Sequence, residues 1–89
     1  MRLHVVVRGR VQGVGFRWFV REAARRLDLA GWVINRPDGG VEVAAEGSAD
    51  SIHALREALA EGPNGASVRS VDDVPDSGVS LDRPFTISR

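Results

Sequence analysis

The spacing of apolar residues changes once near the N-terminus, and this change limits the folds that the chain can adopt. Residues 3–8 alternate between two sets of side chains and are rich in β-branched types, a pattern that predicts a strand. Over residues 16–27 the apolar side chains recur every three or four positions, which predicts a helix with one apolar face. Residues 9–15, between these segments, contain three glycines and predict a loop. The chain therefore begins with a strand, a glycine-rich loop and an amphipathic helix.

A tight hairpin is predicted next. Residues 32–35 and 41–46 have the composition of short strands, and Pro-Asp-Gly-Gly at residues 37–40 is typical of the turn between two strands. We assign that sequence to the turn rather than to catalysis. Glu42 and Glu46 share one face of the second strand, and we interpret them as solvent-facing residues rather than an acid–base pair.

A second helix and two more strands complete the pattern. Ser48 has the residue type of an N-cap and precedes a helical pattern, which Gly-Pro-Asn-Gly at residues 62–65 ends. Residues 68–74 predict a fourth strand, and their irregular alternation suggests a bulge. Residues 75–84 predict a loop, and residues 85–87 a short closing strand.

The order of these elements predicts the fold. Strand, helix, strand, strand, helix, strand, with one short strand added at the C-terminus, is the plan of an α+β, ferredoxin-like split βαβ sandwich. In this plan an antiparallel sheet carries both helices on one face. The length of 89 residues suits one domain, so we assign residues 1–89 to a single domain. The plan alone says little about function, since many activities share it.

Composition excludes several classes of protein. The chain contains no cysteine, which excludes disulfide bonds, thiolate metal sites and thiol nucleophiles. No apolar run approaches the ~18 residues of a membrane span, and the N-terminus lacks the apolar segment of a signal peptide. We therefore expect a cytoplasmic protein that has no membrane partner.

The net charge of zero conceals an uneven distribution. The first 36 residues contain eight arginines and two acidic residues, whereas the remainder contains four arginines and ten acidic residues. This asymmetry favours an anionic ligand near the N-terminal half, while the acidic remainder argues against a nucleic acid partner. All 12 basic residues are arginine, which suits anion recognition but also fits a codon bias.

The first candidate site is the segment of residues 9–17, Gly-Arg-Val-Gln-Gly-Val-Gly-Phe-Arg. Its glycines allow positive φ angles, and consecutive backbone N–H groups that lead into a helix N-terminus can bind an anion. Arg17 falls in the first helical turn, where a cation opposes the helix dipole. A bound phosphate between Arg17 and these amides would explain that position, although a solvated arginine after an ordinary turn fits the spacing equally well. No Gly-Lys-Ser/Thr follows this segment, so it is not a P-loop of the Walker type. Trp18 stands where a dinucleotide-binding fingerprint has its third glycine, so the segment does not match that fingerprint either.

The second candidate is Asn35, at the predicted end of a strand, where asparagine is disfavoured. Its carboxamide both accepts and donates hydrogen bonds, so it can hold a nucleophile without taking its proton. An asparagine that opens the hairpin is the alternative interpretation.

Other polar and aromatic residues give weaker signals. His4 and His53 lack a carboxylate at ligand spacing, and we interpret both as structural or solvated. Trp18 and Trp32 are expected to pack, or to shield the edge of a site, rather than to stack on bases. No combination of residues has the spacing of a metal site.

Two of these segments resemble the signatures of a known family. Residues 9–17 resemble the first signature of the acylphosphatase family, and residues 31–42, Gly-Trp-Val-Ile-Asn-Arg-Pro-Asp-Gly-Gly-Val-Glu, resemble the second. The segment of residues 62–68 is similar to the part of the family that follows its second helix, so the resemblance spans nearly the whole chain. Ile34 stands where the family commonly has a charged residue, and residues 75–84 follow no family pattern.

The resemblance implies an enzyme that hydrolyses acyl phosphates to a carboxylate and inorganic phosphate, by metal-free in-line attack of water. It implies that Arg17 binds phosphate and that Asn35 positions the water. The implied phosphate-binding loop consists of Gln12, Gly13, Val14, Gly15, Phe16 and Arg17. No metal and no cofactor are implied. The expected partners are a small acyl phosphate and inorganic phosphate, the latter as product and competitive inhibitor, and we expect a monomer.

Two rival functions remain open at this point. The first is a non-catalytic anion-binding module, or a domain of a larger enzyme; a start at Met1 and an end soon after the closing strand favour a free-standing enzyme instead. The second is an RNA-binding domain of similar topology. The predicted strands lack paired aromatic residues on a sheet face, which argues against RNA.

Overall fold

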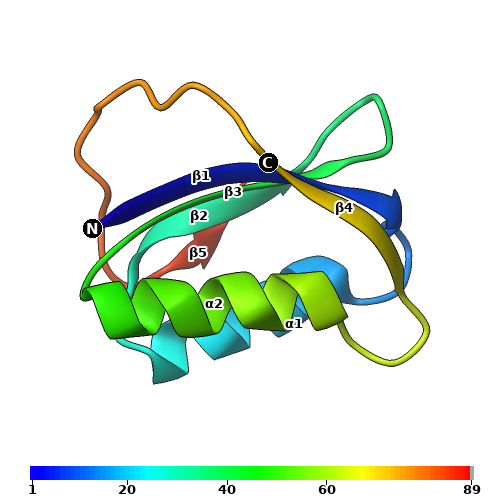
Figure 1. The fold of residues 1–89 in the computed structure, drawn as a ribbon, viewed down its shortest axis with the longest axis horizontal. Helices are drawn as coiled ribbons and strands as arrows, with labels where there is room; N and C mark the ends of the chain where they lie inside the picture. The colour runs from blue at the N-terminus through cyan, green and yellow to red at the C-terminus, as the bar shows by residue number, and fades with distance from the viewer. Residues whose placement is uncertain (89) are drawn as a thin grey trace.

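Two helices cover one face of a five-stranded sheet in the computed structural model, which describes residues 1–88 (Figure 1). The elements are β1 (Arg2–Arg10), α1 (Phe16–Arg26), β2 (Ala30–Asn35), β3 (Val41–Glu46), α2 (Ala49–Glu61), β4 (Ser67–Asp73) and β5 (Thr86–Ile87). Their order confirms the predicted ferredoxin-like plan, and each boundary lies within two residues of its predicted place. Arg89, the last residue of the predicted domain, lies outside the described residues.

The strands lie in the order β4-β1-β3-β2-β5. The pairs β1–β4, β1–β3 and β2–β3 are antiparallel, as predicted, whereas β5 pairs with β2 in parallel and makes the sheet mixed. Residues 74–83 explain this direction, because they carry the chain from the β4 edge across the outer face to the β2 edge (Figure 1). The backbone N–H of Val74 donates to the His4 carbonyl oxygen, and that of Gly31 donates to the Asp82 carbonyl oxygen.

The core lies between the sheet and the helices. From α1 it receives Phe16, Val20, Ala23 and Ala24, and from α2 it receives Ile52, Leu55 and Leu59. These side chains confirm the predicted apolar faces of both helices. The sheet contributes the alternate positions of its strands that face the helices: Leu3, Val5, Val7, Val33, Val41, Val43 and Ala45. Since this packing closes the sandwich, α1 is held against β2, the strand that ends at Asn35.

The two helices begin differently. The Ser48 hydroxyl accepts a hydrogen bond of 3.1 Å from the Ser51 backbone N–H, which confirms the predicted N-cap of α2. The N-cap of α1 is Gly15, whose φ of 75° is left-handed, and no side chain among residues 1–88 caps this helix. The N-terminal amides of α1 are therefore left for another acceptor.

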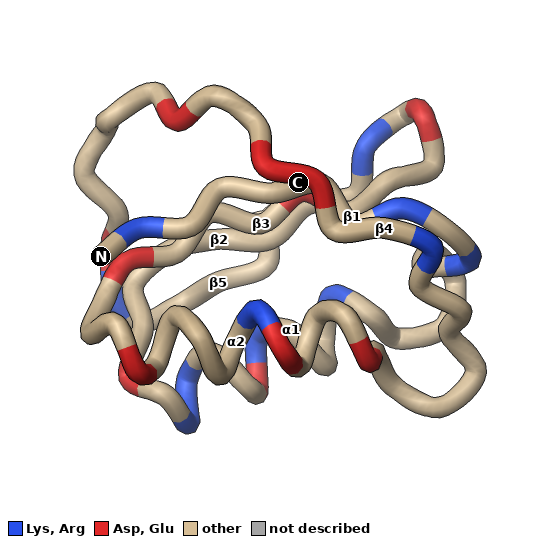
Figure 2. The backbone as a smooth tube through the Cα atoms, in the orientation of Figure 1, with Lys and Arg blue, Asp and Glu red and all other residues tan. Residues whose placement is uncertain are grey.

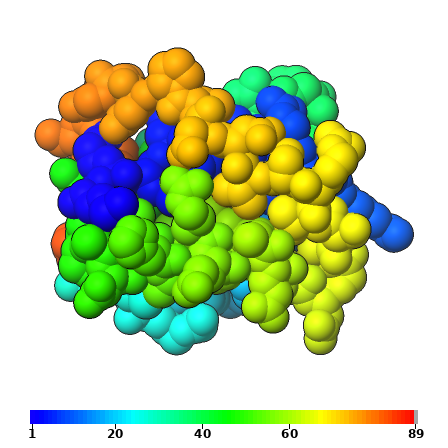
Figure 3. Space-filling view, viewed as in Figure 1, coloured from blue at the N-terminus to red at the C-terminus, as the bar shows by residue number. Residues whose placement is uncertain are grey.

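The outer face of the sheet carries charged side chains that pair with one another and with residues 74–83. Arg2 donates to both carboxylate oxygens of Asp76, at 2.6 and 3.0 Å. Figure 3 shows these residues, in orange, packed against the start of β1, in dark blue. The predicted bulge is confirmed in β4, where Arg69 is the extra residue between partners of Arg8 and Gly9.

Candidate active site

The loop between β1 and α1 turns sharply at two glycines. Gly13 and Gly15 both have a φ of 75°, in the left-handed region that other residues rarely adopt. A Cβ atom at either position would meet no atom of the described residues within 4 Å, so these residues leave open space beside the loop backbone. The prediction that these glycines provide positive φ is confirmed.

The backbone N–H groups of this loop have no hydrogen-bond acceptor among the described residues. For residues 13–18 the structure records no hydrogen bond from a backbone N–H to any described residue. The carbonyl of Gly15 accepts from the Phe19 N–H at 3.0 Å, which starts α1, and the first turn contains no acidic side chain. Unused N–H groups at a helix N-terminus form a positive site that an anion can occupy.

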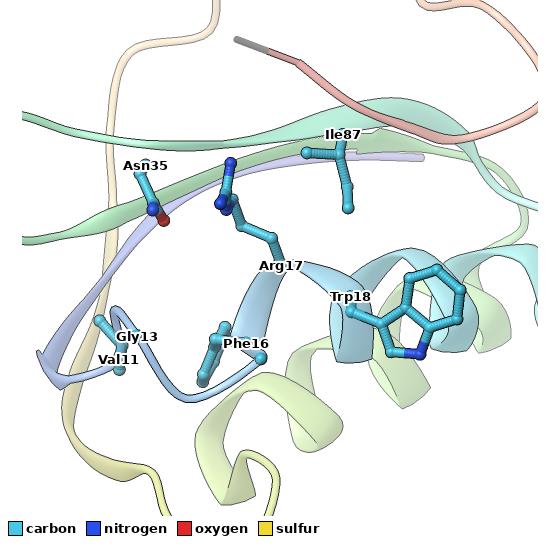
Figure 4. Close-up of a pocket in the computed structure, with 8 residues that line it drawn as sticks. Val11, Gly13, Phe16, Arg17, Trp18, Asn35 and Ile87 are labelled. Carbon is cyan, nitrogen blue, oxygen red and sulfur yellow. The ribbon is translucent and has the colours of Figure 1, made fainter.

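A hollow of about 210 Å³ lies next to these amides (Figure 4). Residues from α1, β2, β5 and the loop line it: Val11, Gly13, Gly15, Phe16, Arg17, Trp18, Asn35 and Ile87. The two sequence-predicted catalytic residues are thus brought to one place from different elements. In Figure 4 the Arg17 guanidinium and the Asn35 carboxamide both extend into the space above the loop.

The Arg17 charge is not neutralised by the described protein. Arg10, Arg17, Arg26 and Arg69 are the arginines of residues 1–88 for which no hydrogen bond or ion pair is recorded, and of these only Arg17 is half-buried. The helix dipole adds to its positive charge in the first turn. Figure 2 shows further basic segments at the end of β1, where the loop to α1 begins. The hollow therefore favours an anion.

Asn35 ends β2 with an unused oxygen. Its Oδ1 atom is buried and accepts no hydrogen bond from a described residue. The hairpin closes without it, because the Arg36 N–H donates to the Gly40 carbonyl at 2.8 Å. Asp38 accepts from the Gly40 N–H at 3.0 Å, which confirms its predicted turn role. The structure offers no support for an Asn35 side chain that opens the hairpin.

Gln12 links the loop to this hairpin. Its Nε2 atom donates to the carbonyl oxygens of Arg36, at 2.8 Å, and Gly40, at 2.9 Å. Gln12 and Val14 were predicted for the phosphate-binding loop, but neither lines the hollow, whereas Gly13, Gly15, Phe16 and Arg17 do. The anchoring role of the Gln12 side chain was not predicted from the sequence. A long carboxamide within a glycine-rich loop could have indicated it.

Comparison with known proteins identifies the family of this chain. A sequence model of the acylphosphatase family, described as "Acylphosphatase", matches residues 3–87. The chain belongs to the acylphosphatase family. The acylphosphatase of Salinibacter ruber is 54% identical over 71 residues, which cover 80% of this chain and 75% of that protein. The match confirms the predicted family and the predicted class of enzyme.

Solved acylphosphatase structures have the same fold. The crystal structure of acylphosphatase from Bacillus subtilis superposes with a TM-score of 0.91 at 38% identity, and covers 99% of this chain and 98% of that one. Full-length HypF, crystallised in a phosphate- and nucleotide-bound form, gives a TM-score of 0.79 at 30% identity. That match covers 99% of this chain but 11% of HypF, so an acylphosphatase-like unit also exists within a larger protein.

Several polar residues of this acylphosphatase-family chain lie away from the hollow. On the outer face, His4 Nε2 lies 2.6 Å from Glu42 Oε2, a contact that the sequence analysis did not predict, and the His4 ring meets Trp32 edge-on. Burial opposes ionisation of Glu42, but hydrogen bonds from His4 and Arg36 outweigh it and lower the pKa of this carboxyl group. Trp18, expected to pack or shield a site edge, does line the hollow.

Metal-binding clusters and membrane-spanning helices are both absent from the part of the chain that the structure describes. Within residues 1–88, no histidine, aspartate or glutamate lines the hollow, and no three such side chains gather closely enough to hold a metal ion. None of the helices over the same residues has the length and apolar character needed to cross a membrane.

Proposed function

We propose that the chain hydrolyses the carboxyl–phosphate bond of small acyl phosphates by metal-free in-line attack of water within this hollow. One observation carries the proposal. Within residues 1–88, an arginine without an acidic partner, backbone amides without acceptors and a carboxamide oxygen without a donor surround the same space. Membership of the acylphosphatase family supports the substrate class.

The phosphoryl group would be held by the loop and by Arg17. Backbone N–H groups of the loop donate to the non-bridging oxygens, and the Arg17 guanidinium donates two further hydrogen bonds in its planar fork. These donors also stabilise the charge that spreads over the phosphoryl oxygens in the transition state. The proposed binding segment comprises Gln12, Gly13, Val14, Gly15, Phe16 and Arg17. Gln12 and Val14 do not line the hollow and would contribute only their backbone amides.

Asn35 would position the water. Its Oδ1 atom accepts a hydrogen bond from the water and aims a lone pair of the water oxygen at phosphorus. The new P–O bond forms while the bond from phosphorus to the acyl oxygen breaks, and the electron pair leaves with the carboxylate. Water and R–CO–OPO₃²⁻ give R–COO⁻ and H₂PO₄⁻, so both protons of the water remain on the phosphate product.

This chemistry suits an acyl phosphate better than a phosphate monoester. A carboxylate leaving group has a conjugate acid with a pKa near ~4 and departs without a general acid. The loose transition state needs little help from a base, so positioning and charge stabilisation are sufficient. Monoester hydrolysis is among the slowest uncatalysed reactions, and among residues 1–88 the groups that line this hollow include no acid to assist its alkoxide leaving group.

We also propose that residues 1–89 act as one domain and that a monomer is competent, because a single chain supplies every group named above. Inorganic phosphate would compete with the substrate for the loop and Arg17.

Hydrolysis of benzoyl phosphate, followed by its loss of ultraviolet absorbance, tests the proposal. We expect turnover that inorganic phosphate inhibits competitively. Phosphate binding without turnover of benzoyl or acetyl phosphate would instead support a non-catalytic anion-binding module, and would contradict the proposed reaction.

A further inference from the structure

Trp18 is unusually exposed for its size. Its side chain is 56% exposed, and the other large apolar residues exposed to this degree within residues 1–88 are Met1 and Val79. Neither of those two lines the hollow, whereas Trp18 does. An indole left in water next to a substrate hollow offers apolar area to a ligand.

The indole is held in place from one side. The Arg21 guanidinium carbon lies 3.9 Å from the centre of the Trp18 ring, and Arg21 is in turn paired with Glu22 at 3.2 Å. A cation over the ring face restricts the rotamer of Trp18. With Arg21 over the ring the side chain is still 56% exposed, so a large part of the indole surface remains available to a ligand.

Ile87 extends this apolar surface from the opposite layer of the fold. It lies on β5, is half-buried, and lines the same hollow as Trp18. In Figure 4, Ile87 and Trp18 lie on one side of Arg17, and Asn35 lies on the opposite side of Arg17. We name the surface formed by Trp18 and Ile87 the acyl ledge.

The direction of the proposed reaction connects this ledge to the substrate. In phosphoryl transfer the attacking and leaving oxygens lie roughly in line, on opposite sides of phosphorus. If Asn35 holds the water on its side of the hollow, the acyl group must leave on the other side. That side is where Trp18 and Ile87 lie (Figure 4).

We propose that the acyl ledge binds the acyl group and selects acyl phosphates with a flat or branched apolar group over acetyl phosphate. The inference rests on the proposed function, since it uses the positions of the water and the phosphoryl group. An aryl ring can stack on the free face of the indole, whereas an acetyl group is too short to cover it. The ledge holds the ground state and the transition state alike, so it should lower KM for apolar substrates and leave kcat nearly unchanged.

The test compares benzoyl phosphate with acetyl phosphate in the wild type and in Trp18→Ala. We expect the ratio of the two kcat/KM values to fall about fivefold to tenfold in the variant, mainly through KM for benzoyl phosphate. Arg21→Ala should lower the ratio less, because it frees the indole without removing it. Val79→Ala removes another exposed apolar side chain, outside the hollow, and should leave the ratio unchanged.

A second measurement separates this inference from the proposed function. Phenylphosphonate and methylphosphonate are not hydrolysed, and their binding constants can be measured by calorimetry whether or not the chain has activity. Trp18→Ala should weaken phenylphosphonate relative to methylphosphonate by a similar factor. A change of less than threefold in both ratios, with an unaltered circular dichroism spectrum, would overturn the acyl ledge. Absence of turnover in the wild type would overturn only the proposed reaction.

Discussion

Gln12 and Arg36 are joined by a hydrogen bond of 2.8 Å from the Gln12 side-chain amide to the Arg36 carbonyl oxygen. This bond connects the loop whose amides face the hollow to the residue that directly follows Asn35. In the proposed mechanism, the distance between the phosphoryl group and the water therefore depends on the Gln12 side chain, although Gln12 does not line the hollow. Even a small displacement of the reacting groups from their productive positions lowers the catalytic rate strongly.

Replacement of this anchor should affect rate more than stability. In Gln12→Leu both carbonyl oxygens keep another donor. The Gly39 N–H donates to the Arg36 carbonyl oxygen, and the Arg36 N–H donates to the Gly40 carbonyl oxygen. We expect the free energy of unfolding to fall by about 1–2 kcal/mol and kcat to fall roughly tenfold to a hundredfold. Urea denaturation and benzoyl phosphate kinetics measure the two effects. A normal kcat would mean that the loop keeps its position without Gln12.

Arg17→Ala should abolish phosphate binding together with turnover. The variant removes the guanidinium that lines the hollow, and we expect kcat/KM to fall about a thousandfold. The inhibition constant of inorganic phosphate should rise in parallel. Arg26→Ala removes the same charge from an exposed position on the same helix and should behave like the wild type. A near-normal rate in Arg17→Ala would refute the site.

Asn35→Ala should separate turnover from phosphate binding. Loss of the water-positioning oxygen is expected to lower kcat by about a hundredfold or more, with little change in phosphate inhibition. Since Oδ1 is buried and accepts no hydrogen bond from a described residue, its removal should leave the free energy of unfolding unchanged or higher. Kinetics, phosphate inhibition and thermal denaturation measure the three quantities. Equal loss of turnover and phosphate binding would show that Asn35 binds the anion instead.

Turnover should survive removal of divalent cations. The proposed donors to the phosphoryl group are backbone amides and Arg17, so no step depends on a metal ion. We expect the same kcat before and after dialysis against EDTA. Activity that is lost on dialysis and restored by zinc or magnesium would contradict the metal-free mechanism.

Asp76 should make stability depend on acidic pH. A hydrogen bond from Arg2, and then one from the Gly78 N–H, lower the pKa of this carboxyl group from its ordinary value of 3.8 to about 2. A depressed pKa contributes stability that is complete above 3.8 and is lost as the pH falls through 2. The stability difference between the wild type and Asp76→Asn should therefore be present at neutral pH and vanish at the acidic end.

Thermal denaturation of both proteins across this pH range measures that difference. Carboxyl NMR of Arg2→Met provides the control, because the pKa of Asp76 should return toward 3.8 without its partner. A difference that stays constant from neutral pH to pH 2 would contradict the assignment to this ion pair.

The sequence by itself determined the order of the elements, the glycine positions and the two signatures that contain Arg17 and Asn35. These features depend on near neighbours, because the period of the apolar pattern and the φ preference of glycine act within a few residues. Only the tertiary structure decided which distant groups meet. Asn35 is positioned at the hollow by the pairing of β2 with β3. Gln12 forms a hydrogen bond with Arg36, 24 residues away in the sequence, and Ile87 lies on a strand of two residues. Local sequence patterns do not encode these long-range contacts, because strand register and crossover connections depend on how the whole sheet packs on its helices.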